Sequence, residues 1–289
     1  MKNKFVTKAV AGVLSLAMVC TMTTVAPTDA YAKTKKSVTV TTQKQLNKAL
    51  KDDSVKGIII KTPKARSFRI ADGDYGNKSL AVDAPKSSIN NAGDFKKITI
   101  RDGKKFTERG EENVFILKDE NKLSLQVAKG SFDSDITVAS DGKGITIGGS
   151  GDIDFIRVKG KAELTVNGKG DCKPDVLVYS EAKLSISSRS EIILYANADL
   201  DVTGAVGNIT VLADANISVA NGASIYGLQI DEGAAKVSIK NDGAIDSIVL
   251  GTKADVNITG SSTSTIPLEN NAKGATITSD CNLDVKLNA

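Results

Sequence analysis

The chain has 289 residues and contains neither histidine nor tryptophan. The lack of histidine excludes a Ser-His-Asp triad, a Cys-His pair and a histidine metal ligand. A net charge of +4 is too small to indicate nucleic-acid binding, and a hydrophobic fraction of 40% is typical of a folded protein.

The first 32 residues have the features of a secretory signal peptide. Three lysines lie within the first eight residues, and an uncharged, mostly apolar run follows from Ala9 to Val25. Ala30-Tyr31-Ala32 then matches the small-x-small pattern of a cleavage site. The alternative is a membrane anchor, but the apolar run is short for a span of about 20 residues. We predict cleavage after Ala32, export from the cell and no later transmembrane segment.

Residues 33–95 are predicted to form an N-terminal cap and the first coils of the fold. Thr42 and Gln45 have the spacing of a capping box, and apolar residues recur behind them at helical intervals, which predicts a short helix over 42–52. Residues 57–60 and 80–82 are apolar enough for buried strands. The polar stretch Pro85 to Gly93 is typical of a loop.

From about residue 96, short apolar-x-apolar triplets alternate with polar turns, and the triplets fall into two interleaved series. Both series recur every 16 to 22 residues, which is typical of a repeat architecture. The first series begins at Leu123, Ile145, Leu164, Leu184, Leu200, Ile217, Val237 and Val256. The second begins at Val114, Ile136, Phe155, Val176, Ile192, Ile209, Leu228 and Ile248.

A small residue precedes the triplets of the first series by two positions. Because side chains alternate between the two faces of a strand, this residue shares the inner face with the triplet. Its recurrence predicts a narrow interior in which identical positions of successive coils line up. The positions are Ala162, Ala182, Ala198, Ala215, Ala235, Ala254 and, before the last triplet, Cys281.

These patterns predict an all-β fold, a single-chain parallel β-solenoid (β-helix) of about nine coils over residues 96–289. Its handedness and cross-section do not follow from the sequence. Cys172 and Cys281 would lie about five coils apart, or roughly 24 Å along the axis. A disulfide needs Cα atoms within about 7 Å, so we expect both thiols to stay unpaired.

The signal pattern, the short capping helix and repeats such as Ala162-Glu163-Leu164-Thr165-Val166-Asn167-Gly168 resemble secreted right-handed parallel β-helix proteins. The resemblance is to the pectin-lyase-like type and to bacterial surface and adhesin proteins, and it covers residues 40–289 by pattern only. It implies an extracellular protein, either free or associated with the cell wall, and it is uninformative about activity.

Enzymes of the pectin-lyase-like type carry Gly-His-Gly or Trp-Ile-Asp-His-like elements, which this chain lacks because it has no histidine and no tryptophan. We therefore expect no catalytic residue, no metal and no cofactor. One alternative stays open, a divergent Ca²⁺-dependent polysaccharide lyase. In it Asp152 and Asp154 would bind the ion and Arg157 or Lys159 would act as the base. The competing interpretation of these residues is a solvated charged face.

The second series contains segments that are apolar on both faces. If Val176, Val178 and their equivalents point inward, an exposed apolar stripe forms over three successive coils, which is typical of a partner or ligand surface. We predict a ligand-binding face on which the tyrosines form a flat ladder for a sugar chain and the hydroxyls of Ser180 and Thr210 orient it. The stripe consists of Leu177, Tyr179, Ile193, Tyr195 and Leu212.

Another element could instead cover this stripe, because apolar runs often mean burial on both sides. The sequence thus favours a secreted, non-catalytic β-solenoid that acts as a surface, matrix or adhesion module. Its expected partner is an extracellular polysaccharide or a cell-wall polymer, and no nucleic acid.

Overall fold

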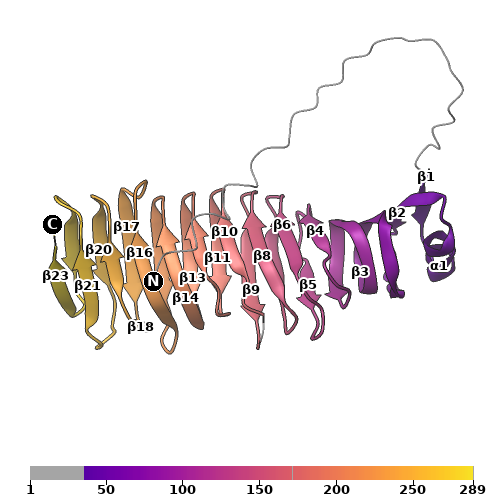
Figure 1. Ribbon diagram of the computed structural model, residues 1–289. Coiled ribbons are helices and arrows are strands. Elements are labelled where there is room, and N and C mark those ends of the chain that lie inside the picture. Colours follow the sequence, from indigo (N-terminus) through magenta and orange to yellow (C-terminus); the bar gives the residue numbers. More distant parts are fainter. Residues whose placement is uncertain (1–35, 171, 289) are drawn as a thin grey trace, which may run out of the picture. The chain divides into compact units, whose positions relative to one another are not determined.

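Short strands, each paired with the strand one turn before and one turn after it, build the protein in a computed structural model that describes residues 36–170 and 172–288. The pairing between successive turns is parallel. The strands follow one another along a single axis from indigo to yellow in Figure 1. The predicted parallel β-solenoid is therefore confirmed, with about 13 turns in all.

Two rows of strands form the two long sides of the coil. The first row comprises β5 (Ser124–Val127), β7 (Lys143–Gly149), β9 (Glu163–Gly168), β11 (Ala182–Ile186), β13 (Ala198–Val202), β15 (Ala215–Val219), β17 (Lys236–Asn241), β20 (Asp255–Thr259) and β22 (Thr276–Ser279). The second row comprises β4 (Val114–Leu117), β6 (Ser134–Val138), β8 (Ile153–Val158), β10 (Asp175–Val178), β12 (Ile192–Leu194), β14 (Ala205–Val211), β16 (Ser224–Ile230), β19 (Ile248–Leu250), β21 (Ile266–Asn270) and β23 (Leu283–Leu287). A short strand, β18 (Ala244–Ile245), pairs with β16.

The interior is filled by small and branched side chains in register. Ala182, Ala198 and Ala215 are direct neighbours on successive turns and are each only 5% exposed. Leu200 and Ile217 follow two residues later and are also buried. The predicted inward position of the alanines is thus confirmed for these turns, where the small Cβ leaves room for the chain to bend.

Beyond β15 the predicted alanine series fails at Ala235, whereas Ala254 is buried as predicted. Ala215 is in register with Val237, not with Ala235, and Ala235 is exposed. The turn before β17 is longer than the turns before β11, β13 and β15, so the inward positions shift by two residues. Cys281 is also misassigned, because it precedes β23 of the second row.

This shift gives a direct test of the register. Ala215→Leu is expected to lower the free energy of unfolding by about 1–3 kcal/mol, because it forces three extra carbon atoms into a filled interior. Ala235→Leu adds the same atoms on the outside and is expected to change the free energy of unfolding by less than about 0.5 kcal/mol. Urea unfolding of the two variants checks this. Equal losses would contradict the register.

Two strands of the second row are one residue out of the predicted register. In β4 the structure buries Phe115 and Leu117 and turns Val114 and Ile116 outward, and Phe115 is the register partner of Ile136. A shift of one residue moves a whole set of side chains to the other face of the sheet. β4 is apolar on both faces, so its pattern alone does not reveal which set points inward.

β8 shows the same shift for a different reason. Ile156, not Phe155, points into the core, because an irregularity between Ser134 and Asp135 leaves Asp154 as an extra residue in β8. Such a bulge places one unpaired residue in a strand and reverses the facing of the residues after it.

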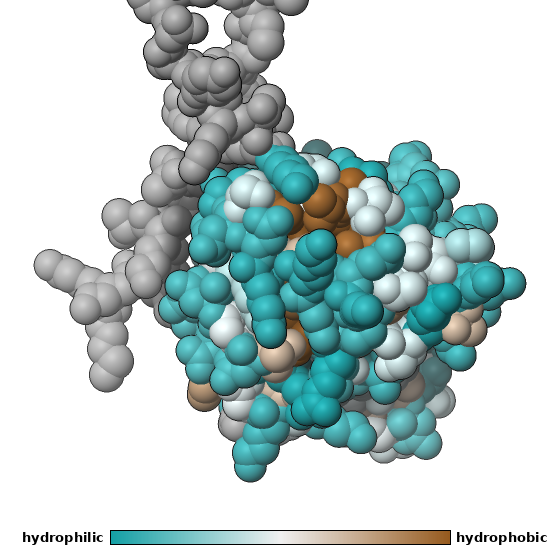
Figure 2. All heavy atoms as spheres, turned by 90° about the vertical axis from the view of Figure 1, so that its right-hand side faces the viewer, coloured by the Kyte–Doolittle hydropathy of each residue, from teal (hydrophilic) through white to brown (hydrophobic). Residues whose placement is uncertain are grey.

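At the N-terminal end, α1 (Gln43–Lys51) confirms the predicted helix, and the capping box between Thr42 and Gln45 is present. The helix buries Leu46, Ala49 and Leu50 against the core of the coil. Figure 2 looks at this end and shows a mostly hydrophilic surface with a hydrophobic patch near the top of the view.

The coil also extends further toward the N-terminus than the repeats suggested. β1 (Lys36–Val40), β2 (Val55–Lys61) and β3 (Ser67–Glu108) pair in parallel as its first turns. β3 runs through Pro85 to Gly93, so the predicted loop there is wrong. This stretch keeps the extended backbone and pairs through it, although its side chains are mostly polar.

Both cysteines that the structure describes, Cys172 and Cys281, are buried and free, as predicted. The signal-peptide prediction falls on residues 1–32, outside the described residues. Within 36–170 and 172–288, no helix has the length and apolar character needed to cross a membrane.

Candidate functional site

The stripe predicted from the sequence lies on three adjacent strands of the second row. β10 pairs with β12, and β12 pairs with β14, so Leu177, Ile193 and Thr210 are direct neighbours on the outer face. Val176 and Val178 fill the core behind them. Leu177, Ile193 and Thr210 are half-buried, so the outer face of this row is apolar over two turns and becomes polar at the third.

Tyr179 and Tyr195 directly follow β10 and β12 at the next outward position. Their backbone N–H groups donate to Val158 O at 2.8 Å and to Val178 O at 2.9 Å, which continues the ladder past the strand ends. The side chains are 45% and 41% exposed, so the residues described by the structure leave both rings open to solvent. Leu212 holds the corresponding position on the next turn and is half-buried.

The two tyrosine rings stack on each other. Their centroids are 4.9 Å apart and their planes differ by 3°. Rings this close cannot lie edge to edge in one plane, so each covers part of its neighbour's face. The predicted flat ladder is therefore a ridge of stacked rings, with two phenol groups one turn apart. Ring stacking restricts both side chains before any ligand arrives, which reduces the entropic cost of binding.

The Tyr179 hydroxyl of this ridge stays protonated at neutral pH. Burial raises the pKa of the Tyr179 hydroxyl above its ordinary value of 10, and the neighbouring Tyr195 raises it further. Phenol O–H groups both donate and accept hydrogen bonds, as sugar hydroxyls do.

Carboxylates lie at the other end of the same strands. Asp175 begins β10, and Glu191 directly precedes β12. Burial raises the pKa of Asp175, and the charges of Glu191 and Asp154 raise it further. Each of these two turns thus presents, in order, a carboxylate, an apolar residue and a tyrosine.

Arg157 of β8 borders the face, because it is the register partner of Leu177. Its guanidinium lies 4.4 Å from the centroid of the Phe155 ring and 3.0 Å from a carboxylate oxygen of Asp135. This side chain is therefore held by an aromatic ring and by an ion pair. A general base needs a free electron pair, whereas this guanidinium is the cation of the ion pair with Asp135.

The geometry does not support the alternative in which Asp152 and Asp154 bind Ca²⁺. Asp152 is half-buried and Asp154 is exposed. Partial loss of solvent around Asp154 raises the pKa of its carboxyl, and the charges of Asp135, Asp133 and Asp152 raise it further. Over the described ranges, no three acidic or cysteine side chains come together in an arrangement that could hold a metal ion.

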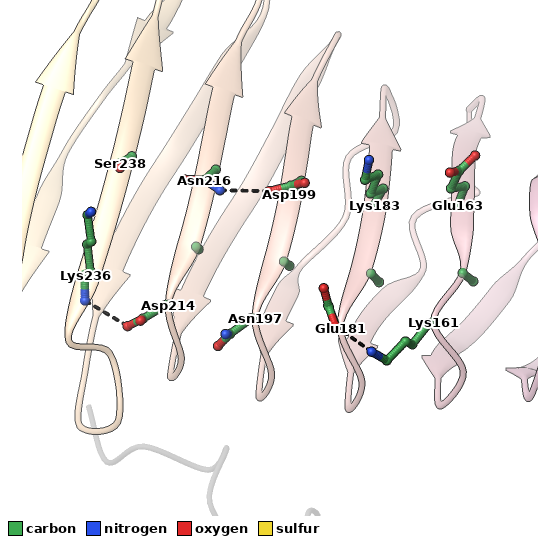
Figure 3. A pocket seen from close by; sticks show the side chains of 14 residues that line it. Lys161, Glu163, Glu181, Lys183, Asn197, Asp199, Asp214, Asn216, Lys236 and Ser238 are labelled. Atoms are coloured by element: carbon green, nitrogen blue, oxygen red, sulfur yellow. Dashed lines mark hydrogen bonds and ion pairs between the residues drawn. The ribbon is translucent and has the colours of Figure 1, made fainter. Parts of the chain in front are cut away.

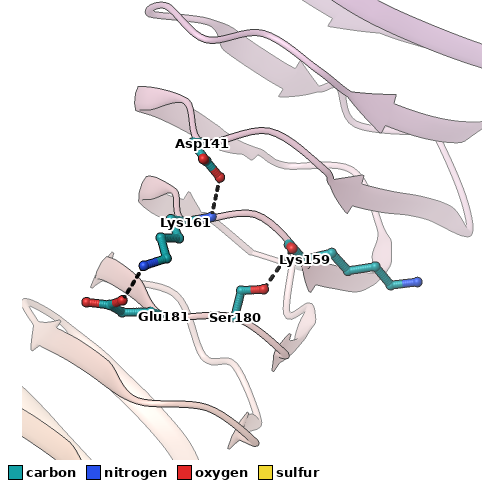
Figure 4. A network of polar contacts seen from close by, with 5 residues as sticks. All are labelled: Asp141, Lys159, Lys161, Ser180 and Glu181. Atoms are coloured by element: carbon teal, nitrogen blue, oxygen red, sulfur yellow. Dashed lines mark hydrogen bonds and ion pairs between the residues drawn. The ribbon is translucent and has the colours of Figure 1, made fainter.

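Ser180, which we expected to orient a ligand, has a structural partner instead. Its hydroxyl donates to the carbonyl of Lys159 at 2.7 Å (Figure 4). Beside it, Lys161 donates its backbone N–H to Asp141 and its ammonium to Glu181, at 2.7 and 2.8 Å. These contacts join three successive turns at one corner of the coil.

The outer face of the first row forms a second, polar depression that the sequence patterns did not single out (Figure 3). Some of its polar side chains already have partners within the coil. Asn216 donates to Asp199 at 2.8 Å, and the backbone N–H of Lys236 donates to Asp214 at 2.8 Å. The sequence does contain the residues of this depression, as the polar residues between the apolar positions of each repeat. Polar outer positions are usual for any exposed sheet face, so they did not indicate a depression.

Comparisons with protein-family models, curated proteins and solved structures found no match. The likeness to pectin-lyase-like and adhesin proteins therefore rests on the repeat pattern and on the parallel coil alone.

Proposed function

We propose that this protein is an extracellular, non-catalytic β-solenoid that binds a glycan chain along the ridge of Tyr179 and Tyr195. The observation that supports it is the exposed stack of two tyrosines on successive turns. Large aromatic side chains are costly to leave in water, and exposed apolar stripes commonly mark binding surfaces. The proposed location outside the cell depends on the signal pattern of residues 1–32.

The repeat of the coil suits an extended polymer. Successive turns are about 4.8 Å apart, which is comparable with the length of one sugar residue in an extended chain. A glycan that runs along the axis would thus meet one tyrosine hydroxyl per residue. Leu177 and Ile193 would contact its apolar C–H surface, and Asp175 and Glu191 would accept hydrogen bonds from its hydroxyls.

The test compares binding to a panel of neutral and acidic polysaccharides. Tyr179→Ser combined with Tyr195→Ser is expected to weaken binding at least tenfold, or about 1.4 kcal/mol. Tyr226 provides the matched control, because it is 67% exposed and lies on β16, two turns away from β12. Tyr226→Ser is expected to leave the affinity unchanged.

Affinity electrophoresis measures this directly. Tyrosine emission is a second readout, since the chain has no tryptophan to mask it. Wild-type protein that binds no member of the panel, or equal affinity of the double variant, would contradict the proposal. Release of ultraviolet-absorbing products that requires Ca²⁺ and is lost in Arg157→Ala would replace it with a lyase.

A further inference from the structure

In the last turn that the structure describes, apolar side chains at inward positions are exposed. Leu283, Val285 and Leu287 of β23 occupy the inward positions that Ile266, Leu268 and Asn270 fill one turn earlier. Ile266 and Leu268 are buried, whereas Val285 is 44% and Leu287 is 72% exposed. Among residues 36–170 and 172–288, β21 is the only strand that pairs with β23.

The free edge of β23 presents backbone groups in a definite order. Ile266 N–H donates to Asn282 O at 2.9 Å, and Asn288 N–H donates to Asn270 O at 3.0 Å. The backbone N–H and C=O groups of the even-numbered residues in this segment therefore point toward β21. Because these groups alternate in direction along a strand, those of Leu283, Val285 and Leu287 point away from β21. An edge of this kind is a ready site for another strand.

The charges on β23 indicate which strand fits this edge. Asp284 and Lys286 flank Val285, and both are exposed on the outer face. A second β23 that runs antiparallel, with the two Val285 residues opposed, places Asp284 beside Lys286 of the partner subunit. By symmetry, Lys286 lies beside the partner's Asp284. The same register sets Leu283 against the partner's Leu287, so apolar residues also meet apolar residues.

The hydrogen-bond order agrees with this register. The opposed Val285 residues form a hydrogen-bonded pair, because both direct their backbone groups to the free edge. Asp284 and the partner subunit's Lys286 then form a non-hydrogen-bonded pair, in which side chains come closest together. The antiparallel arrangement with opposed Val285 residues therefore pairs opposite charges, apolar side chains and backbone hydrogen-bonding groups at the same time.

We propose that two copies of this chain associate through this end, with β23 pairing antiparallel to β23 of the partner subunit about a two-fold axis at Val285. The association is closed, because both copies use the same surface. The opposite end is not equivalent, since α1 packs against the core there. The inference does not depend on glycan binding.

The test exploits the two charges. Asp284→Lys sets a second lysine against the partner's Lys286, and Lys286→Asp creates the converse pair of aspartates. Each single variant is expected to weaken dimerisation at least tenfold in sedimentation equilibrium of the purified protein. An equimolar mixture of the two variants restores both opposite-charge pairs and is expected to dimerise like the wild type. The double variant D284K/K286D is expected to do the same.

Matched controls use charges outside this strand. Lys240→Asp, on the outer face of β17, is expected to leave dimerisation unchanged. A wild-type protein that stays monomeric from micromolar to millimolar concentration would overturn the inference. Dimers that both single variants form as tightly as the wild type would overturn it as well, because they would use another surface.

Discussion

Replacing Phe115 by alanine is expected to lower the free energy of unfolding by about 3–5 kcal/mol, the usual cost of removing a buried aromatic ring. Phe115 is completely buried between Ile98 and Ile136 of the adjacent turns. Its ring meets that of Phe106 edge to face, with centroids 5.5 Å apart. The coil backbone is held by pairing on both sides, so the cavity cannot collapse easily.

Phe132 provides the control for this substitution. It is 52% exposed, and Phe132→Ala is expected to cost no more than about 0.5 kcal/mol. Urea unfolding followed by circular dichroism compares the two variants with the wild type. Similar losses for Phe115→Ala and Phe132→Ala would show that the register of β4 is wrong.

The second large effect concerns Glu108, a carboxyl group buried in the N-terminal part of the coil. It accepts hydrogen bonds from the backbone N–H groups of Arg109 and Gly110 and from the side-chain amides of Asn91 and Asn113. Burial raises its pKa from 4.5 to about 7, although these donors oppose the shift. The folded protein therefore binds a proton at Glu108 more tightly than the unfolded chain does.

This difference predicts that stability falls as the pH rises. The contribution of Glu108 is fully present below about pH 4.5 and is lost as the pH rises through about 7. The total change is about 3 kcal/mol at 1.36 kcal/mol per pKa unit. The chain has no histidine, so the ordinary source of a pH dependence near pH 6.5 is absent.

Urea unfolding at a series of pH values between 4.5 and 8 measures this slope. Glu108→Gln cannot titrate and is expected to flatten it, whereas Glu232→Gln, at an exposed position, is expected to leave it unchanged. A wild-type stability that is constant over this range, or a slope that persists in Glu108→Gln, would contradict the assignment.

The parallel coil could be predicted from the sequence because its repeats keep one residue type at one inward position. Ala182, Ala198 and Ala215 satisfy that pattern, and they are neighbours in the structure. The prediction failed at Ala235, since a longer turn before β17 shifts the register and places Val237 beside Ala215.

The polar N-terminal turns could not be predicted for a different reason. Asn91, Glu108 and Asn113 are buried, but they satisfy one another through hydrogen bonds rather than by apolar contact. The periodicity of hydrophobic residues in the sequence does not reveal such a hydrogen-bond network. Backbone pairing therefore continues through a stretch whose composition is typical of a loop.

The candidate site was predictable in position but not in geometry. Burial of Val176 and Val178 places Tyr179 on the outside, and the parallel register brings Tyr195 beside it. The stacking of the rings depends on side-chain rotamers, which the pattern does not contain. Likewise, the partner of Ser180 is a backbone carbonyl, which no residue spacing indicates.

Engineered disulfides test the parallel coil itself most directly. Asp201 and Ser218 are register partners on the outer faces of β13 and β15, so their Cα atoms lie about 5 Å apart, within the range that a disulfide bridges. Asp201 and Asn216 differ from this pair by two positions and lie roughly 8 Å apart, beyond that range.

With the native cysteines replaced by alanine, the D201C/S218C variant is expected to form an intramolecular disulfide on mild oxidation, and D201C/N216C is expected to stay reduced. Mass spectrometry of the unreduced protein distinguishes the two states. A disulfide in D201C/N216C, with free thiols in D201C/S218C, would contradict the parallel coil.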